Sequence, residues 1–275
     1  MRAGFIGLGN MGVRIADQIV EAGFPLAVWA RRSASVEPYA GRPGVAIVDS
    51  PAAVGAASDV VGLCVWSDDD VEDVLLRDDG VLAGMAPGGI VAIHSTVSPE
   101  LCARLAERAA AGGVAVVDAP VSARAMEKKL LVMVGGDDEP VARCRPLFTS
   151  FGDPVVHLGG LGSGQLAKLV NNVLLAAHIA LADDALALGK ALGLDEDQLA
   201  EALLRGSSST VPGMQMLRGL AAPPTDESSQ TRKWAIKDVA LMLEVLGHRG
   251  VADERPLLAM GRLGATITAE GRAAR

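Results

Sequence analysis

A chain of 275 residues with a formal net charge of −8 is long enough for two moderate domains and lacks the basic surface that nucleic-acid binding requires. Half of the residues are hydrophobic and 21% are charged, which is typical of a globular protein in water. The three cysteines are far apart, metal-ligand spacings are missing, and we find no signal peptide and no apolar stretch long enough for a membrane span. We therefore expect a cytoplasmic protein with no metal.

Short apolar runs alternate with helical patterns in the first half of the chain. The strand-like runs cover residues 2–7, 25–30, 57–66, 88–95 and 112–120. Helical patterns cover residues 10–23 and 98–113, and Ser98 can cap the second helix with Pro99 in its first position. Strands that alternate with helices predict a parallel sheet with helical crossovers.

The composition changes near residue 160. Helical patterns rich in alanine and leucine then cover residues 164–193, 195–206, 232–250 and 252–271, and residues 220–230 form a loop-like segment. We therefore predict an α/β domain over residues 1–160 and an all-helical domain over residues 161–275, linked by the long helix that starts near residue 164.

The segment GFIGLGNMG carries three glycines in the spacing of a dinucleotide-binding loop. It follows a strand-like run and precedes a helical pattern, which is the context that this motif needs. Gly7 allows the tight turn, Gly9 lets a pyrophosphate approach the backbone, and Gly12 lets helix and strand pack closely. The loop predicts a Rossmann-type cofactor domain in which Leu8, Asn10 and Met11 also lie against the cofactor. The alternative is an ordinary glycine turn.

The end of the second strand predicts the type of cofactor. NAD sites usually carry an acid there to bind the ribose hydroxyls, but this chain has Ala30, followed by Arg31, Arg32 and Ser33. Two guanidinium groups can bind a 2′-phosphate through paired hydrogen bonds. We expect NADP(H) to be preferred over NAD(H), unless the arginines are simply solvated surface groups.

Lys168 and Asn172 interrupt the apolar pattern of the long helix. They are four residues apart, so they lie on one helical face, whereas Asn171 lies about 100° round from Asn172. A lysine with apolar neighbours can have a lowered pKa and exchange a proton near neutral pH. The alternative is a lysine whose stem packs on the helix while its ammonium reaches water.

Five motifs in order resemble the β-hydroxyacid dehydrogenase family, which includes 3-hydroxyisobutyrate dehydrogenase and several semialdehyde reductases. They are GFIGLGNMG, STVSP at 95–99, DAPVS at 118–122, GQLAKLVNN at 164–172 and KDVALM at 237–242. The resemblance runs over almost the whole chain. It implies that Lys168 is the catalytic acid/base and that Asn172 binds and orients the substrate.

The resemblance also implies roles for residues elsewhere in the chain. Ser122 would hold the substrate carboxylate together with the positions after it, Ala123 and Arg124, and Asp238 would support the site. The implied cofactor contacts outside the glycine loop and the arginines are Trp66, Ser67, Val71, Thr96 and Lys237.

The sequence departs from the family pattern most clearly after Ser122. Ala123 and Arg124 replace two glycines, and the loop is about three residues short. Arg124 could bind a second anionic group or face the solvent, and we expect Lys128 and Lys129 to form a solvated surface. Ser67 also stands where the family usually has proline. His94, beside the Ser-Thr pair, is interpreted as a packed histidine.

The sequence therefore predicts an NADP(H)-dependent oxidoreductase that interconverts a small β-hydroxy acid and its semialdehyde or keto acid. The alanine- and leucine-rich helices favour a homodimer or homotetramer. Two alternatives remain: an imine reductase of the same fold, and a dinucleotide-binding protein without catalytic activity. The motifs leave the particular hydroxy acid open.

Overall fold

The computed structural model describes residues 1–123, 128–206, 213, 216 and 232–270. The chain forms two compact units, Met1–Lys168 and Leu169–Arg275, and each is described separately. Arg124, one of the residues implied to bind substrate, lies outside the described residues, as does the loop predicted at residues 220–230.

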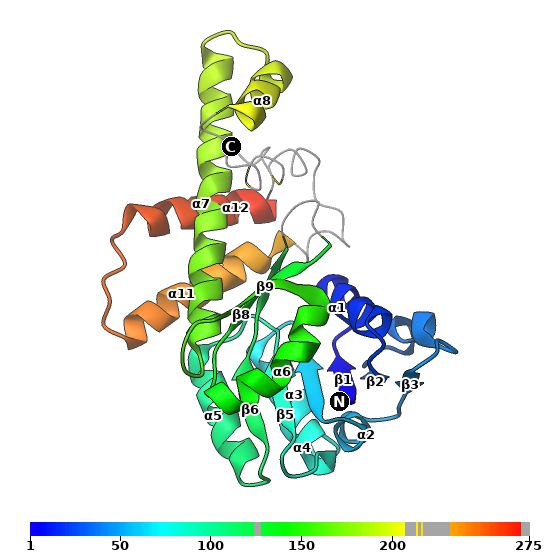
Figure 1. Cartoon of the computed structure of the whole chain (residues 1–275). Coiled ribbons are helices and arrows are strands. Elements are labelled where there is room, and N and C mark those ends of the chain that lie inside the picture. Colours follow the sequence, from blue (N-terminus) through cyan, green and yellow to red (C-terminus); the bar gives the residue numbers. More distant parts are fainter. Residues whose placement is uncertain (124–127, 207–212, 214–215, 217–231, 271–275) are drawn as a thin grey trace. The chain divides into compact units, whose positions relative to one another are not determined.

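A six-stranded parallel sheet forms the first unit (Figure 1). Its strands, in spatial order, are β3 (Val45–Ile47), β2 (Leu26–Trp29), β1 (Ala3–Ile6), β4 (Val60–Leu63), β5 (Ile90–Ile93) and β6 (Ala115–Asp118). The helices are α1 (Asn10–Glu21), α2 (Pro51–Ala57), α3 (Asp68–Leu76), α4 (Val81–Gly84), α5 (Pro99–Ala110) and α6 (Asp138–Phe151), with short 3₁₀ turns at Ser33–Ser35 and Glu37–Tyr39. The predicted Rossmann-type parallel sheet is confirmed.

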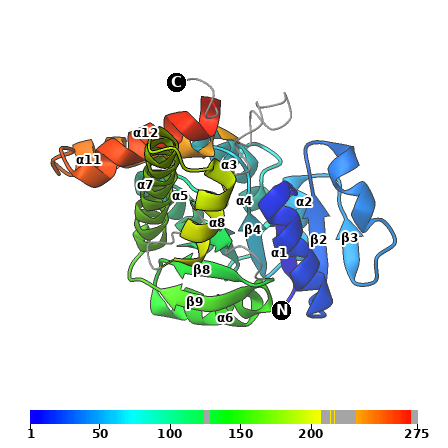
Figure 2. The ribbon, with the colours of Figure 1, turned by 90° about the horizontal axis from the view of Figure 1, so that it is seen from above.

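Both faces of this sheet are covered by helices, so its strands are buried on both sides (Figure 2). On β5, Ile90 and Ala92 pack in one core with α1 and α6, whereas Val91 and Ile93 pack in the other core with α3 and α5. This alternation follows the two-residue period of a strand and explains why the strand sequences are continuously apolar.

A second, smaller sheet lies in the same unit. It consists of β7 (Val121–Ala123), β8 (Leu130–Val134) and β9 (Gly152–His157), with β7 antiparallel to β8 and β9 parallel to it. These strands were not predicted from the sequence. Lys129, expected to be merely solvated, donates hydrogen bonds to the carbonyl oxygens of Thr149 and Ser150 near the end of α6, and Lys128 pairs with Glu21 at 2.6 Å.

Helices make up the described part of the second unit. They are most of α7 (Ser163–Ala191), which begins in the first unit, then α8 (Glu196–Arg205), α11 (Trp234–His248) and α12 (Pro256–Glu270). Two glycines allow α12 to approach α7 closely, since a Cβ atom added at Gly264 would overlap the Ala176 carbonyl and one at Gly261 would press on Val173.

Helix α7 corrects one sequence expectation. By length and composition it could cross a membrane, with a mean hydropathy of 1.4 over its most apolar window, whereas the sequence analysis found no such stretch. However, 56% of that window is buried within the protein. The apolar composition is accounted for by packing inside the fold, where α12 lies against this helix.

Candidate active site

The glycine loop connects β1 to α1 and has the shape of a phosphate cradle. Gly7 has a φ of +101°, and a Cβ atom there would overlap the Cys64 carbonyl. A Cβ atom on Gly12 would overlap the Gly7 carbonyl, but one on Gly9 would meet no protein atom within 4 Å. Gly7 and Gly12 are therefore required by the fold itself, whereas the absent side chain of Gly9 leaves open space above the backbone.

Helix α1 begins at this open space without a side-chain cap. Its N-cap is Gly9, which has no side chain, and no acidic residue lies in its first turn. An uncapped helix start offers backbone N–H groups and the positive end of the helix dipole to an anion. The loop therefore fits the pyrophosphate of a dinucleotide, and Leu8, Asn10 and Met11 lie within it.

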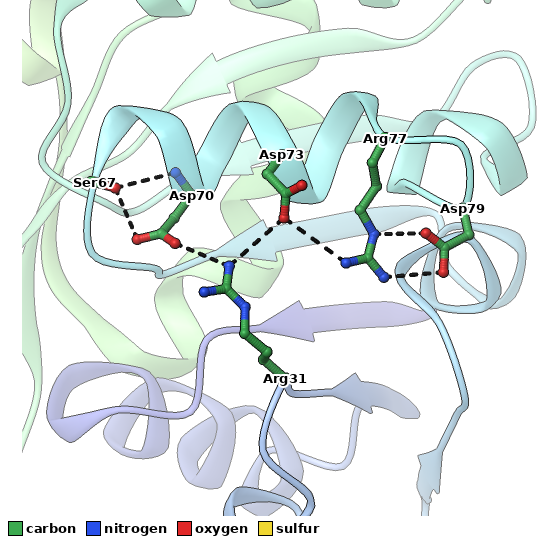
Figure 3. A network of polar contacts seen from close by, with 6 residues as sticks. All are labelled: Arg31, Ser67, Asp70, Asp73, Arg77 and Asp79. Carbon is green, nitrogen blue, oxygen red and sulfur yellow. Dashed lines mark hydrogen bonds and ion pairs between the residues drawn. The ribbon is translucent and has the colours of Figure 1, made fainter.

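The predicted 2′-phosphate residues lie at the end of β2. Arg31, Arg32 and Ser33 are all exposed. Arg31 contacts two carboxylates of α3, Asp70 at 3.0 Å and Asp73 at 3.7 Å (Figure 3). These acidic partners could not be predicted from the sequence, because they come from a helix 39 and more residues further along the chain.

The loop after β4 holds Trp66 and Ser67. Trp66 is exposed, and Ser67 caps α3 by accepting a hydrogen bond from the Asp70 backbone N–H at 3.2 Å. Ser67 therefore performs a local task, in addition to any cofactor contact, at the position where the family usually has proline. Val71 is fully buried in the core beneath this loop.

Gln165 and Asp118 fix the start of α7 on the ends of β5 and β6. The Gln165 side chain donates a hydrogen bond to the Ser95 carbonyl at 2.9 Å and accepts one from the Val97 N–H at 3.1 Å, so it bridges the two neighbours of Thr96. The fully buried Asp118 carboxylate accepts hydrogen bonds from the backbone N–H groups of Gly162 at 2.6 Å and Gln165 at 2.7 Å.

Asp118 acts as a remote cap for α7. Burial raises the pKa of its carboxyl, although the hydrogen bonds from the backbone act in the opposite direction. Glycine is needed at Gly135 and Gly164, where an added Cβ atom would crowd this carboxylate. Asp118 and Gln165 lie in the motifs DAPVS and GQLAKLVNN, but no role was predicted for either residue. The available signals were an acid at the end of a buried strand and an amide in a first helical turn.

Lys168 follows Gln165 by three residues and is half-buried on α7. Burial raises the pKa of the Cys64 thiol, just after β4, to about 12, and the positive charge of Lys168 acts in the opposite direction. Cys64 in turn lies against Gly7 of the glycine loop. Lys168 is therefore placed at the C-terminal ends of the strands, on the side of the sheet where the dinucleotide loop follows β1.

In the second unit, the structure brings together three residues that the sequence analysis selected. Asn172 donates a hydrogen bond from Nδ2 to Asp238 Oδ2 at 2.6 Å, and Lys237 Nζ lies 3.1 Å from Asp238 Oδ1. Asn171 donates to Asn172 Oδ1 at 3.0 Å, so the orientation of the Asn172 amide is held from both sides. Asn172 and Asp238 are both buried.

The remaining selected residues are placed as follows. Ser122 is half-buried on β7 and Ala123 is exposed at the end of that strand. His94 is buried among Phe5, Phe148 and Phe151, with Nδ1 2.7 Å from the Ala119 carbonyl oxygen, so its interpretation as a packed histidine is confirmed.

Comparison with known proteins identifies the family. The profile of the NAD binding domain of 6-phosphogluconate dehydrogenase matches residues 2–159. The profile described as NAD-binding of NADP-dependent 3-hydroxyisobutyrate dehydrogenase matches residues 162–272. Together the two profiles span almost the entire sequence.

Individual relatives agree with these profiles. The chain is 39% identical over 206 residues to the NAD-dependent L-serine dehydrogenase of Pseudomonas aeruginosa and 36% identical over 206 residues to the 3-hydroxyisobutyrate dehydrogenase of the same organism. Each alignment covers 74% of this chain and 69% of the relative. The fold matches 3-hydroxyisobutyrate dehydrogenase of Mycobacterium tuberculosis, in a structure with L-serine, at a TM-score of 0.79 and 26% identity, over 100% of this chain and 95% of that one.

The protein has a dinucleotide-binding glycine loop on a parallel sheet that is covered by helices on both faces, and a helical unit follows it in the chain. These features define an NAD(P)-dependent oxidoreductase. The profiles and relatives narrow the class further. The chain belongs to the β-hydroxyacid dehydrogenase family, as the motifs of its sequence predicted, and is an NAD(P)-dependent hydroxyacid dehydrogenase.

Proposed function

We propose that this protein interconverts a small β-hydroxy acid and its semialdehyde or keto acid, with NADP(H) preferred over NAD(H) and with Lys168 as the general acid/base. The observation that carries the proposal is the anchoring of α7. Asp118 and Gln165 fix the first turn of this helix at the sheet edge, and Lys168 follows one turn later, within electrostatic reach of Cys64 beside the glycine loop.

The cofactor would lie along this edge of the sheet. The loop from Gly7 to Gly12 would hold the pyrophosphate. Trp66 and Ser67 would contact the cofactor from the loop after β4, and Thr96 would lie by the nicotinamide and its ribose. Arg31, Arg32 and Ser33 would bind the 2′-phosphate, and Lys237 would also contact the cofactor. When bound, the nicotinamide supplies or accepts the hydride.

The proposed reaction requires the protein to manage a proton and a carboxylate. In reduction, Lys168 Nζ donates a proton to the carbonyl oxygen as negative charge develops there; in oxidation, neutral Lys168 removes the proton from the hydroxyl. Asn172, oriented by Asp238 and Asn171, would hydrogen-bond the reacting oxygen. Ser122, Ala123 and Arg124 would bind the substrate carboxylate.

Steady-state absorbance of the reduced nicotinamide tests this proposal. L-serine, L-threonate and 3-hydroxyisobutyrate are tested for oxidation, and small semialdehydes and a cyclic imine for reduction, each with both cofactors. Turnover of a hydroxy acid or semialdehyde with a higher kcat/KM for the phosphorylated cofactor supports the proposal. Equal or better use of NAD(H) would remove the preference but leave the reaction, and turnover of a cyclic imine alone would replace the reaction with imine reduction.

The apolar surface of α7 supports a homodimer or homotetramer as the working form, and we propose that this form works in the cytoplasm. Exposed side chains recur at Val170, Leu174, Leu181 and Leu188, with spacings of four and seven residues that align them along one helix. Such a stripe is typical of a protein interface. Light scattering coupled to size exclusion should show a dimer or tetramer, and Leu181→Lys should shift the protein toward the monomer.

A further inference from the structure

Arg31 is bound by acidic residues of α3. Its Nη2 atom donates a hydrogen bond to Asp70 Oδ1 at 3.0 Å and lies 3.7 Å from Asp73 Oδ2 (Figure 3). Asp70 and Asp73 are three residues apart, so they lie on neighbouring turns of one face of α3. Two carboxylates therefore share a single guanidinium at the place where we propose that a 2′-phosphate binds.

The position of Asp70 is itself fixed. Ser67 Oγ donates to Asp70 Oδ2 at 2.9 Å while accepting from the Asp70 backbone N–H at 3.2 Å. One carboxylate oxygen is thus bound by Ser67 and the other by Arg31. The side chain of Asp70 is only 26% exposed, compared with 64% for Arg31, so the acid is the better anchored partner of the pair.

The contacts continue along α3 as a ladder of alternating charges, defined here as Asp70, Arg31, Asp73, Arg77 and Asp79 (Figure 3). Asp73 lies 3.9 Å from Arg77, which pairs with Asp79 at 2.7 Å. Three carboxylates and two guanidinium groups leave the ladder with one net negative charge.

Two other acids of α3, Asp68 and Glu72, have other partners. Asp68 accepts hydrogen bonds from the backbone N–H and the hydroxyl of Ser98, and Glu72 lies 3.6 Å from Arg104. The contacts with Arg31 therefore come from Asp70 and Asp73 rather than from the general acidity of the helix.

We propose that Asp70, assisted by Asp73, is a specificity-determining residue that competes with the 2′-phosphate of NADP(H) for Arg31. This inference rests on the proposed cofactor site. A neutral 2′-hydroxyl, as in NAD(H), leaves the ladder intact. A 2′-phosphate brings up to two negative charges to Arg31 and must displace Asp70 or share the guanidinium with it, close to two like charges.

Asp70 and Asp73 therefore reduce the preference for NADP(H) that Arg31 would otherwise give, and they let the enzyme use NAD(H) as well. Because these groups are partly exposed, the effect is moderate. Removing one like charge beside a dianion should change the discrimination between the cofactors by about five- to tenfold.

The variant Asp70→Asn tests the inference, since asparagine keeps the shape and can still accept from Arg31 while its charge is gone. Asp79→Asn is the matched control, because it makes the same charge change on the same ladder at a residue that contacts Arg77 instead. For each protein the dissociation constants of NADPH and NADH are measured by titration calorimetry, together with kcat/KM for both cofactors.

We define the cofactor ratio as kcat/KM with NADPH divided by kcat/KM with NADH. We expect Asp70→Asn to raise this ratio about five- to tenfold over the wild type, with NADPH binding more tightly, while Asp79→Asn leaves it within about twofold. In an Arg31→Gln background, Asp70→Asn should have no effect on the ratio. An unchanged ratio, or weaker NADPH binding in Asp70→Asn, would overturn the inference, the latter by showing that Asp70 positions Arg31 for the phosphate.

The ratio separates this inference from the proposed function. Failure of the wild type to bind either cofactor would remove the cofactor site and the inference together. If the wild type binds and turns over the cofactors but Asp70→Asn leaves the ratio of kcat/KM for NADPH and NADH unchanged, only the proposed role of Asp70 is wrong.

Discussion

Replacing Asp118 by alanine should loosen the helix that carries Lys168. The carboxylate is fully buried and accepts the backbone N–H groups of Gly162 and Gln165 at 2.6 and 2.7 Å. In Asp118→Ala both N–H groups lose their acceptor where water cannot replace it. Each unsatisfied group costs about 1–3 kcal/mol, partly offset because the buried charge is also removed.

We therefore expect the free energy of unfolding to fall by about 3 kcal/mol. For a chain of this size, each 1 kcal/mol corresponds to about 2–4 °C, so the melting temperature should fall by about 6–12 °C. Displacement of the first turn of α7 should also lower kcat about 10- to 100-fold, because general acid/base catalysis depends on the position of the proton donor. Calorimetry and steady-state kinetics measure the two effects.

Asp195→Ala provides the control. Asp195 caps α8 in the ordinary way, accepting from the Gln198 N–H at 2.9 Å in an exposed position. Losing it should cost only about 1 kcal/mol and should leave kcat unchanged. An Asp118→Ala protein that melts within 1 °C or so of the wild type with full activity would refute the argument that Asp118 anchors the catalytic helix.

Two further predictions concern pH and the glycine loop. Burial lowers the pKa of His94 to about 4 from its usual 6.5, so folding favours the neutral ring and stability is full above pH 6.5. Up to about 3 kcal/mol of the free energy of unfolding is lost as the pH falls toward 4. Thermal melts between pH 7.5 and 4.5 should show this fall in the wild type and a smaller one in His94→Phe. Gly9→Ala should have the melting temperature of the wild type but bind NADPH at least about tenfold more weakly. Gly12→Ala should also lose stability, because its Cβ atom would overlap the Gly7 carbonyl. Equal melting temperatures for the two variants would contradict this distinction.

Much of the fold could be predicted because local sequence signals agree with it. The apolar runs around residues 90–93 and 115–118 are strands buried on both faces, and their alternation with helices requires a parallel sheet. The strand Val45–Ile47 was missed because it is short and lies at the sheet edge, where burial imposes little pattern. The small second sheet was missed because β7 is only three residues long and because β8 and β9 pair across the intervening helix α6.

The candidate site was only partly predictable, because its residues meet through long-range contacts. The glycine loop could be recognised locally, since strand, turn and helix are consecutive. By contrast, Asp118 and its partners are 44 and 47 residues apart, and Asn172 and Asp238 are 66 apart. Arg31 was predicted to meet a phosphate, but nothing beside it in the sequence indicates that Asp70 would reach the same guanidinium.

The role of Lys168 is the central claim, and Lys168→Ala tests it most directly. Single-turnover and steady-state rates are measured with the best substrate found, together with NADPH affinity, and Lys190→Ala serves as the control because Lys190 is an exposed lysine on the same helix. The account predicts that kcat falls by about 10²–10⁴ in Lys168→Ala while NADPH affinity stays within about threefold. A Lys168→Ala enzyme that retains the kcat of the wild type would contradict the account.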